Sequence, residues 1–414
     1  MVGKIVLISI LLGLFPLTGY SFQKEIIITV ENVSSSCFKD EMVEIPLETL
    51  WKEKEVRNEP FLLIDDNNKE MAYQITHDSL LIFQVTLEAN STKKIKLVNG
   101  QPTVPETFAC GKYYKQRMDD IAWENDKVAF RLYGPAIERT GQQLYGYDIF
   151  TKRGTDKPVV ENRYKMMGNP DVRKEANRLR KMGKKKEAAA LEYKNSYHVD
   201  HGNGMDCYAV GPTLGAGATA LMVDSTLLFP YCYKDYEILD NGPLRFTLKL
   251  TFAPKQIGDD RNVVETRIIQ LDKGSYLNKT TVKYYGLTGC RDIVAGIVIH
   301  SSNPNGYSYC KEKGYVAYTD LTQNPKNNNG EIYIGVLFDT SPKWVGTISH
   351  PQKGKGNTAY NGHVVGISKY KSGELFTYYW GNSWSKNGWN EEKWKEYILY
   401  KRQYLCDKFN VKID

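Results

Sequence analysis

Short apolar runs broken by polar turn clusters fill the first quarter of the chain. Between residues 24 and 100, six runs rich in β-branched and aromatic residues are separated by clusters such as Asp-Asp-Asn-Asn and Glu-Ala-Asn-Ser. Runs of this length and composition, bounded by turn residues, are typical of strands. The pattern predicts a small N-terminal β-sandwich, which we place at residues 22–105.

Longer apolar runs joined by hairpin signals follow. One run contains Asn-Gly at 241–242 and another contains Asp-Lys-Gly at 272–274, and both signals predict tight connections between antiparallel strands. Helix-forming composition is concentrated in a basic stretch at 171–194 and at the end of the chain from about residue 390. The sequence therefore predicts an all-β protein with few helices, in which a domain at residues 106–414 packs long antiparallel sheets face to face around a concave surface.

The chain begins like an exported protein. Lys4 precedes an apolar run that starts at Ile5, and the small residues Gly19 and Ser21 lie near its end. This is the pattern of a signal peptide, which we place at residues 1–21. No later segment is apolar enough to span a membrane, so the sequence predicts a periplasmic or extracellular location.

Cysteine usage and charge narrow the function further. The seven cysteines are widely spaced without a Cys-x-x-Cys pair, which argues against structural zinc and leaves one or two disulfides open. Nine of the residues between Asp171 and Lys194 are Lys or Arg and four are acidic, as in a solvated helix or a surface that attracts an anionic glycan. Export disfavours nucleic acid as a partner. The 29 tyrosines and seven tryptophans suit strands and also provide flat surfaces for sugar rings.

The stretch YHVDHGNGMD, residues 197–206, has an unusual density of titratable groups. His198 follows Tyr197, and His201 is three residues further on, among glycines that permit a tight loop. Three interpretations stay open: a divalent metal held by His198, His201 and either Asp200 or Asp206, a polar turn with hydrogen-bonded histidines, and acid–base catalysis, for which imidazole has a suitable pKa. We expect no required cofactor, with the metal as the alternative.

Other polar residues occur at the ends of strands or within them. His300 ends an apolar strand and His363 begins another, so either can lie at the rim of a sheet or simply bond to a loop. Arg131 and Arg139 are candidates to grip a substrate carboxylate with a bidentate fork, although a solvent-facing position is the commoner fate of each.

The aromatic segment near the C-terminus offers a binding surface. Trp380 and Trp384 belong to a run of tryptophans and tyrosines mixed with Gly, Asn and Ser, which is an unusual composition for a core strand. They could stack on sugars or plug the sheet against the last helix. The chain has neither a Gly-x-Ser-x-Gly elbow nor a glycine-rich phosphate loop.

Four segments carry a resemblance to one family: ENDKVAFRLYGPAIE, LYGYDIFTKR, YHVDHGNGMDCYAVGPTLGAG and FTYYWGNSWSKNGW. They resemble a family of exported Bacteroidetes proteins from polysaccharide utilisation loci, known as a domain of unknown function, and the resemblance spans nearly the whole mature chain. It implies a supersandwich of the galactose-mutarotase and polysaccharide-lyase type, and work on acidic oligosaccharides or polysaccharides. The basic helix before the central motif is longer than the family pattern.

A related activity in such loci is β-elimination on a uronic acid, by a lyase or a dehydratase, and the residues suit its chemistry. We expect His201 or His300 as the base, Tyr197 as the acid, and His198 with Arg131 near the carboxylate. A glycoside hydrolase on the same fold, a non-catalytic glycan-binding protein, and a mutarotase or epimerase are the alternatives. Paired carboxylates would favour the hydrolase, but their pairing is spatial and the sequence singles out no pair.

Overall fold

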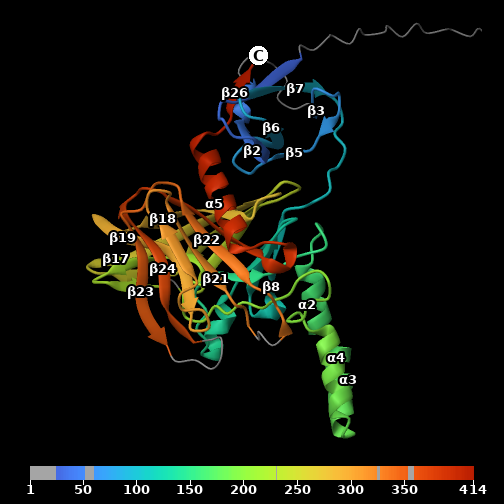
Figure 1. Ribbon diagram of the computed structural model, residues 1–414, viewed down its shortest axis with the longest axis vertical. Coiled ribbons are helices and arrows are strands. Elements are labelled where there is room, and N and C mark those ends of the chain that lie inside the picture. Colours follow the sequence, from blue (N-terminus) through green and yellow to red (C-terminus); the bar gives the residue numbers. More distant parts are fainter. Residues whose placement is uncertain (1–24, 52–59, 230, 324–326, 353–358) are drawn as a thin grey trace, which may run out of the picture.

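The computed structural model describes residues 25–51, 60–229, 231–323, 327–352 and 359–414. The expected signal peptide therefore lies outside the described residues. Figure 1 shows a small β-rich body at one end of the long axis, a larger β body below it, and a pair of helices that projects from the larger body.

The small body is a β-sandwich of two antiparallel sheets, with strand orders β26-β1-β7-β3-β4 and β2-β6-β5. In β1, alternate residues Ile26, Ile28 and Val30 are buried, because successive side chains of a strand point to opposite faces. The elements of this body are β1 (Ile26–Asn32), β2 (Phe38–Pro46), α1 (Leu47–Trp51), β3 (Phe61–Ile64), β4 (Glu70–Met71), β5 (Tyr73–Ile75), β6 (Leu80–Leu87), β7 (Ser91–Asn99) and β26 (Asn410–Ile413).

The last strand departs from the expected domain division. We expected residues up to 414 in the large domain, but β26 pairs with β1, with Ile413 opposite Ile28. Without β26, β1 would be an edge strand with unpaired backbone groups. The C-terminal strand therefore completes the N-terminal sandwich.

The large body contains a four-stranded, a five-stranded and a nine-stranded sheet in the described residues, and neighbouring strands within these sheets run antiparallel. The first has the order β11-β10-β9-β8, and its strands are β8 (Cys110–Tyr114), β9 (Asp120–Glu124), β10 (Ala129–Leu132) and β11 (Asp148–Phe150). The second has the order β13-β12-β19-β24-β23, formed by β12 (Ala216–Val223), β13 (Thr226–Leu228), β19 (Cys290–His300), β23 (Trp344–Gln352) and β24 (Tyr360–Lys371).

The nine-stranded sheet packs against the five-stranded one, since β12 and β19 contact β22, and their inner faces share one apolar core. This supersandwich with few helices confirms the predicted all-β fold. The strands of the large sheet are β14 (Tyr233–Asn241), β15 (Arg245–Phe252), β16 (Lys255–Ile257), β17 (Asp260–Asp272), β18 (Leu277–Tyr285), β20 (Tyr307–Cys310), β21 (Tyr315–Asp320), β22 (Ile332–Phe338) and β25 (Phe376–Trp384).

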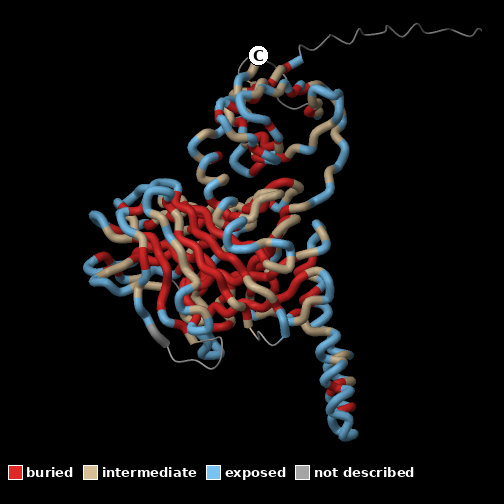
Figure 2. Tube along the Cα trace, viewed as in Figure 1, coloured by how far each residue is buried: buried red, intermediate tan, exposed pale blue. Residues whose placement is uncertain are grey.

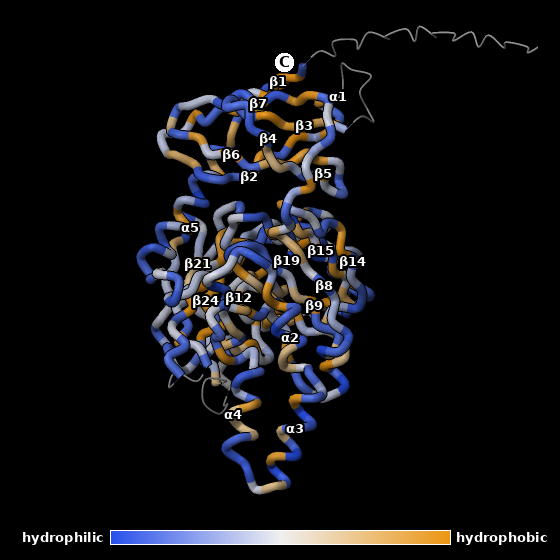
Figure 3. The backbone as a smooth tube through the Cα atoms, turned by 90° about the vertical axis from the view of Figure 1, so that its right-hand side faces the viewer, coloured by the Kyte–Doolittle hydropathy of each residue, from blue (hydrophilic) through white to orange (hydrophobic). Residues whose placement is uncertain are grey.

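The basic segment at 171–194, which we expect to be helical, forms a hairpin of two helices. Gly183, in the left-handed region at φ 75°, separates α3 (Pro170–Lys181) from α4 (Lys185–Asn195), and α2 (Val160–Gly168) joins the pair to the body. Figures 1 and 2 show the hairpin projecting from the body with mostly exposed residues, and Figure 3 shows that most of its residues are hydrophilic.

Helix α5 (Glu391–Cys406) connects the two bodies. The Asn390 side chain caps it by accepting a hydrogen bond from Lys393 N at 2.8 Å. Its Trp394 and Ile398 are buried in an apolar cluster with residues of β22, while Tyr404 donates to Met42 O of the small sandwich at 3.0 Å.

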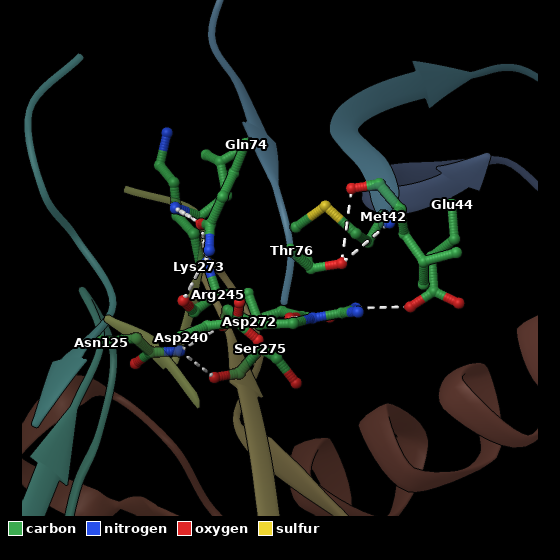
Figure 4. A network of polar contacts seen from close by, with 12 residues as sticks. Met42, Glu44, Gln74, Thr76, Asn125, Asp240, Arg245, Asp272, Lys273 and Ser275 are labelled. Carbon is green, nitrogen blue, oxygen red and sulfur yellow. Dashed lines mark hydrogen bonds and ion pairs between the residues drawn. The ribbon is translucent and has the colours of Figure 1, made fainter. Parts of the chain in front are cut away.

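A polar network, which we call the interdomain joint, fixes the same connection (Figure 4). Arg245 at the start of β15 bonds to Glu44 of the small sandwich at 2.5 Å and to Asp272 of β17 at 2.6 and 2.8 Å. Gln74 accepts from Arg245 N at 2.8 Å and donates to its carbonyl at 3.1 Å. These bonds fasten β2 and β5 to the end of the nine-stranded sheet.

Two further expectations concern the described part of the chain. None of the helices there combines the length and apolarity needed to cross a membrane. All seven cysteines lie within it, and the structure pairs none of them with another.

Candidate active site

A cavity of about 500 Å³, which we call the site cavity, opens between the four-stranded sheet, the segment after α4 and the end of β19. Acidic, basic and phenolic side chains converge on it from elements that are far apart in sequence. The lining residues with chemistry of interest are Arg117, Asp120, Arg131, His198, Tyr208 and His300.

The loop at 197–206 is held in place by its own polar groups and by Arg153. The Asp200 carboxylate accepts from the backbone N–H groups of Gly202 and Gly204 at 2.8 and 3.0 Å, and Arg153 pairs with it at 2.7 Å. Gly204 has φ 99°, and a Cβ there would lie 1.9 Å from the Thr151 carbonyl oxygen. Only glycine fits such a position.

This loop brings Tyr197 and His198 to the site cavity. Tyr197 is buried, and its hydroxyl accepts a hydrogen bond from Arg117. His198 is half-exposed and donates from Nδ1 to the Asp206 carbonyl at 3.0 Å, which leaves Nε2 as its unprotonated nitrogen when the ring is neutral. Both residues therefore lie where an active site would need them, although neither role follows from position alone.

Arg131 lines the cavity but is already bound to acids. Its Nε lies 2.9 Å from Asp148, and its Nη2 bonds to Asp148, to Asp206 at 2.9 Å and to Tyr133 at 2.7 Å. Both aspartates and the arginine are buried. We expected Arg131 to grip a substrate carboxylate, but two internal carboxylates compensate its charge, so it is better suited to shaping the floor of the cavity.

Arg117 is a cation at the cavity that has no acidic partner among the described residues. It stacks on the rings of Tyr164 and Tyr197 at 5.2 and 5.0 Å, and no carboxylate of the described chain forms an ion pair with it. Its Nε is buried without a hydrogen-bond partner. A guanidinium that is held by aromatic rings and keeps an unused donor can bind an incoming carboxylate.

Asp120 follows Arg117 after two residues with left-handed backbone, Met118 at φ 59° and Asp119 at φ 65°. It is 2% exposed, and its Oδ1 has no hydrogen-bond partner. Burial raises the pKa of its carboxyl to about 7, against the opposing effect of the Arg131 and Arg117 charges. A carboxyl group with this pKa can carry a proton near neutral pH.

His300 faces the cavity from the end of β19. Its Nδ1 lies 2.5 Å from Asp320 of β21, whose other oxygen accepts from Thr322 N at 2.7 Å. An ionised Asp320 can only accept, so Nδ1 carries the hydrogen and Nε2 is left with its lone pair. Tyr208 packs against the imidazole at 5.7 Å between ring centroids, and its buried hydroxyl has no partner.

Three predicted residues lie outside the site cavity. His201 is exposed and its Nε2 bonds to the Ser196 carbonyl at 2.9 Å, since the Asp200-centred turn places it away from the lining residues. Arg139 is exposed on the 3₁₀ helix Pro135–Thr140, 3.9 Å from Asp119. His363 is fully buried between the sheets and accepts from Leu214 N at 3.2 Å; burial lowers its pKa to about 3, so it is neutral.

The two tryptophans are core residues rather than a stacking surface. Trp380 stacks on Tyr147 with 4.1 Å between centroids and donates to Thr280 Oγ1 at 2.8 Å. Trp384 donates to the Asn329 carbonyl at 2.8 Å, and both are 1% exposed or less. The prediction of a sugar-stacking wall is wrong because this stretch of β25 is buried on both faces.

The proposed metal ligands do not gather. Within the described ranges, no group of three or more His, Cys, Asp or Glu side chains is placed to hold a metal ion. The Asp206 carboxylate bonds to Arg131, and the His201 imidazole bonds to the Ser196 carbonyl. These two groups therefore do not converge with His198 on one point.

Arg117, Asp120 and Tyr208 were missed by sequence reasoning. Residues 101–120 show no clear period in the sequence, yet they contain β8, a 3₁₀ turn (Lys115–Arg117) that places Arg117 at the cavity, and the first residue of β9, Asp120. A basic residue close to two acids and two tyrosines in KYYKQRMDD was the available signal. Tyr208 had no signal beyond its place two residues after Asp206.

Solved structures resemble the chain only remotely. A glycosyl hydrolase family 38 protein of Enterococcus faecalis aligns with 94% of this chain and 47% of its own length, at 9% identity and a TM-score of 0.47. An alpha-mannosidase from the same organism aligns with 94% and 46%, at 9% identity and a TM-score of 0.46. The chain spans about half the length of these proteins. A structural similarity this remote supports no conclusion about activity.

Sequence relatives are more informative about kinship. An uncharacterized protein of Formosa agariphila is 25% identical over 351 residues, which cover 81% of this chain and 77% of that protein. The family model described as a domain of unknown function, DUF4861, matches residues 30–411, which include the small sandwich, the site cavity and α5. The chain belongs to the DUF4861 family.

Proposed function

We propose that this protein is an exported enzyme that acts on uronate-containing oligosaccharides by β-elimination, as a lyase or a dehydratase. One observation carries the proposal: the site cavity combines an arginine without an acidic partner, a carboxyl group that holds a proton near neutral pH, and a histidine oriented by a buried aspartate. These residues are Arg117, Asp120 and His300.

Elimination needs the substrate carboxylate to be neutralised. When the proton at C5 of a uronate leaves, negative charge develops on the adjacent carboxyl group. If that group is already an anion, the added charge is unfavourable and the C5 proton is less acidic. The guanidinium of Arg117 supplies the compensating charge in this proposal, with its free Nε as donor. Tyr164 and Tyr197 hold it in a fixed plane, so little ordering is needed on binding.

His300 accepts the C5 proton. Asp320 binds Nδ1 and leaves the lone pair of Nε2 available, and it also stabilises the imidazolium that forms. The C5–H electrons form the C4–C5 double bond as the C4–O bond breaks. In this arrangement the proton removed from carbon resides on His300 until solvent takes it.

Asp120 donates a proton to the oxygen that leaves C4. Its pKa of about 7 keeps it largely protonated below neutral pH, and Oδ1 has no competing partner. The leaving oxygen belongs either to the next sugar, which makes the reaction a lyase step, or to a hydroxyl group, which makes it a dehydration. Burial raises the pKa of Tyr208 well above its usual value, so its hydroxyl stays protonated and serves as a hydrogen-bond donor to the substrate.

A glycoside hydrolase is the second candidate, and Asp120 also favours it. A carboxyl with a raised pKa is the usual general acid of such enzymes, and Asp206 is a second carboxyl group at the same cavity. Asp206, however, is bound to Arg131, which limits its use as a nucleophile or base. The elimination therefore has the better support.

The experiment is incubation of the purified protein with size-defined oligosaccharides of several uronate glycans while ultraviolet absorbance of unsaturated uronate is recorded. Elimination predicts rising absorbance with at least one glycan, and loss of that signal in His300→Gln. New reducing ends without absorbance would mean hydrolysis instead of elimination. If no glycan of the set gives either signal, both activities are contradicted.

A further inference from the structure

Two further cavities are neighbours of the site cavity. His198 lines both the site cavity and a second cavity of about 230 Å³, which also contacts Asn328 and Lys386. A third cavity of about 430 Å³ shares Tyr193 and Val199 with the second. The shared lining residues make the second cavity the neighbour of both others, and the third borders the helical hairpin at Arg173.

The second cavity has a lining suited to polar, anionic sugars. It is bordered by Asp200 and by three consecutive amides, Asn327 to Asn329. Lys386 forms no ion pair within the described chain, so its ammonium can meet a further carboxylate. An apolar ligand would gain little from such walls, whereas the hydroxyl and carboxyl groups of a uronate could bond to several of them.

The third cavity carries an exposed aromatic ring. Tyr193, in the last turn of α4, is 62% exposed, although nearby Tyr164 and Tyr197 are buried. A single exposed tyrosine needs no explanation by itself. Here it lies where the two outer cavities meet, beside Arg173 of α3, and its flat face can stack on a pyranose while the arginine meets a carboxylate.

The hairpin adds longer-range attraction. Nine of its residues between Asp171 and Lys194 are basic and four are acidic. A projecting element with this excess of positive charge raises the local concentration of a polyanion near the cavities at its base. Short neutral sugars would gain nothing from it.

We infer that the three cavities form one binding groove, so that the substrate is an anionic oligosaccharide of several uronate units rather than a single sugar. One end of the chain lies in the site cavity, the next unit passes His198 toward Lys386, and a further unit stacks on Tyr193. The inference rests on the proposed function for its substrate class, but it concerns binding and not the bond that breaks.

The test measures affinity by calorimetry for disaccharides and hexasaccharides of alginate, polygalacturonate, glucuronan and chondroitin, with every protein carrying His300→Gln so that the proposed base is absent and the ligand is not consumed. The His300→Gln protein is expected to bind at least one hexasaccharide more tightly than its disaccharide. Tyr193→Ala should reduce that ratio roughly tenfold, which corresponds to about 1.4 kcal/mol. Tyr285→Ala removes a similarly exposed tyrosine on β18 that lines none of the three cavities, and it should preserve the ratio.

Three results would contradict the inference of one groove: equal affinity for both lengths, an unchanged ratio in Tyr193→Ala, or no binding of any hexasaccharide. Because the His300→Gln background reports binding without turnover, a length-dependent affinity there, together with no unsaturated product from the wild type, would reject the elimination and leave the groove standing. Unsaturated product from disaccharides, without any gain from longer chains, would do the reverse.

Discussion

The interdomain joint and the site cavity both contain charged residues with little exposure. They differ in whether these charges have partners within the protein. In the joint, Arg245 lies between Glu44 and Asp272, with one nitrogen, Nη1, left over. At the cavity, none of the described residues gives Arg117 an acidic partner or donates a hydrogen bond to Asp120 Oδ1. Charges that are paired within the protein suit a rigid contact between domains. Charges without such a partner suit a binding site, where the ligand supplies the partner.

The difference has an energetic meaning. A buried polar atom without a partner costs about 1–3 kcal/mol, so a fold keeps few of them without a reason. Left-handed non-glycine residues cost a comparable amount, and Met118 and Asp119 lie side by side between Arg117 and Asp120. Strain and unsatisfied groups thus coincide at the cavity, as expected for a functional site.

Replacement of His300 should give the largest effect on activity. His300→Gln removes the proposed base, and a loss of about 10³-fold in kcat is expected, within the range for general acid–base groups. His201→Gln is the matched control, because His201 bonds to Ser196 outside the cavity. The measurement is the initial rate of unsaturated product formation; equal losses in both variants would remove the distinction between the two histidines.

Arg117 should be next in importance. Arg117→Met keeps most of the stacking on Tyr164 and Tyr197 but removes the charge, and kcat/KM for an anionic substrate should fall about 10²-fold, as expected for loss of a charge-assisted contact. Steady-state kinetics with Arg139→Met as the exposed control checks this. A smaller loss of kcat/KM in Arg117→Met than in Arg139→Met would mean that the substrate carboxylate does not bind at Arg117.

Arg245 should matter for stability and not for chemistry. Arg245→Met leaves Glu44 and Asp272 without their cation, and the free energy of unfolding should fall by about 2–3 kcal/mol, less than for fully buried pairs because both acids are partly exposed. Denaturant unfolding gives the stability and the rate per folded molecule gives the activity. Lost activity without lost stability would mean that the joint takes part in function.

Asp120 and Asp272 should respond to the same substitution with opposite signs. The folded pKa of Asp120, about 7, is raised above its ordinary value of 3.8, so its contribution to stability is present below pH 4 and is lost as the pH rises through 7. Asp120→Asn should therefore stabilise the protein at pH 8 by on the order of 2 kcal/mol relative to pH 4, while reducing activity. Asp272→Asn, in the joint, should destabilise it, and unfolding at both pH values distinguishes the two.

His363 provides the smallest expected effect. Its folded pKa of about 3 lies below its ordinary 6.5, so the stability that it contributes is present above pH 6.5 and is lost as the pH falls toward 3. His363→Gln, which can still accept from Leu214 N, should reduce the stability lost between pH 6.5 and 5 by about 1 kcal/mol. An unchanged pH dependence would mean that His363 becomes protonated in the folded state without a cost.

The sequence predicted the fold better than the site. Turn clusters and hairpin dipeptides identify strands locally, which is why the all-β prediction holds. The β26–β1 pairing joins residues at opposite ends of the chain and has no local signal. Likewise, both faces of β25 are buried, so the spacing of Trp380 and Trp384 could not distinguish a core from a binding surface.

The glycine loop and the end of β19 were the recoverable parts of the site. Tyr197, His198 and His300 stood out because polar residues occur where an apolar strand or a helix ends. The partner of His300, Asp320, lies on β21, and such pairing between strands is decided by the tertiary fold. Arg117 and Asp120 were missed because the short strands β8 and β9 carry little periodic signal.

Mass spectrometry of the products tests the central claim most directly. The protein is incubated with the uronate hexasaccharides, and the masses of the products are compared with those of the substrate, for the wild type and for His300→Gln. Elimination predicts either fragments with an unsaturated end or loss of one water from the intact chain, and neither product with His300→Gln. Fragments that have gained water, or unsaturated products formed equally well by His300→Gln, would contradict the account.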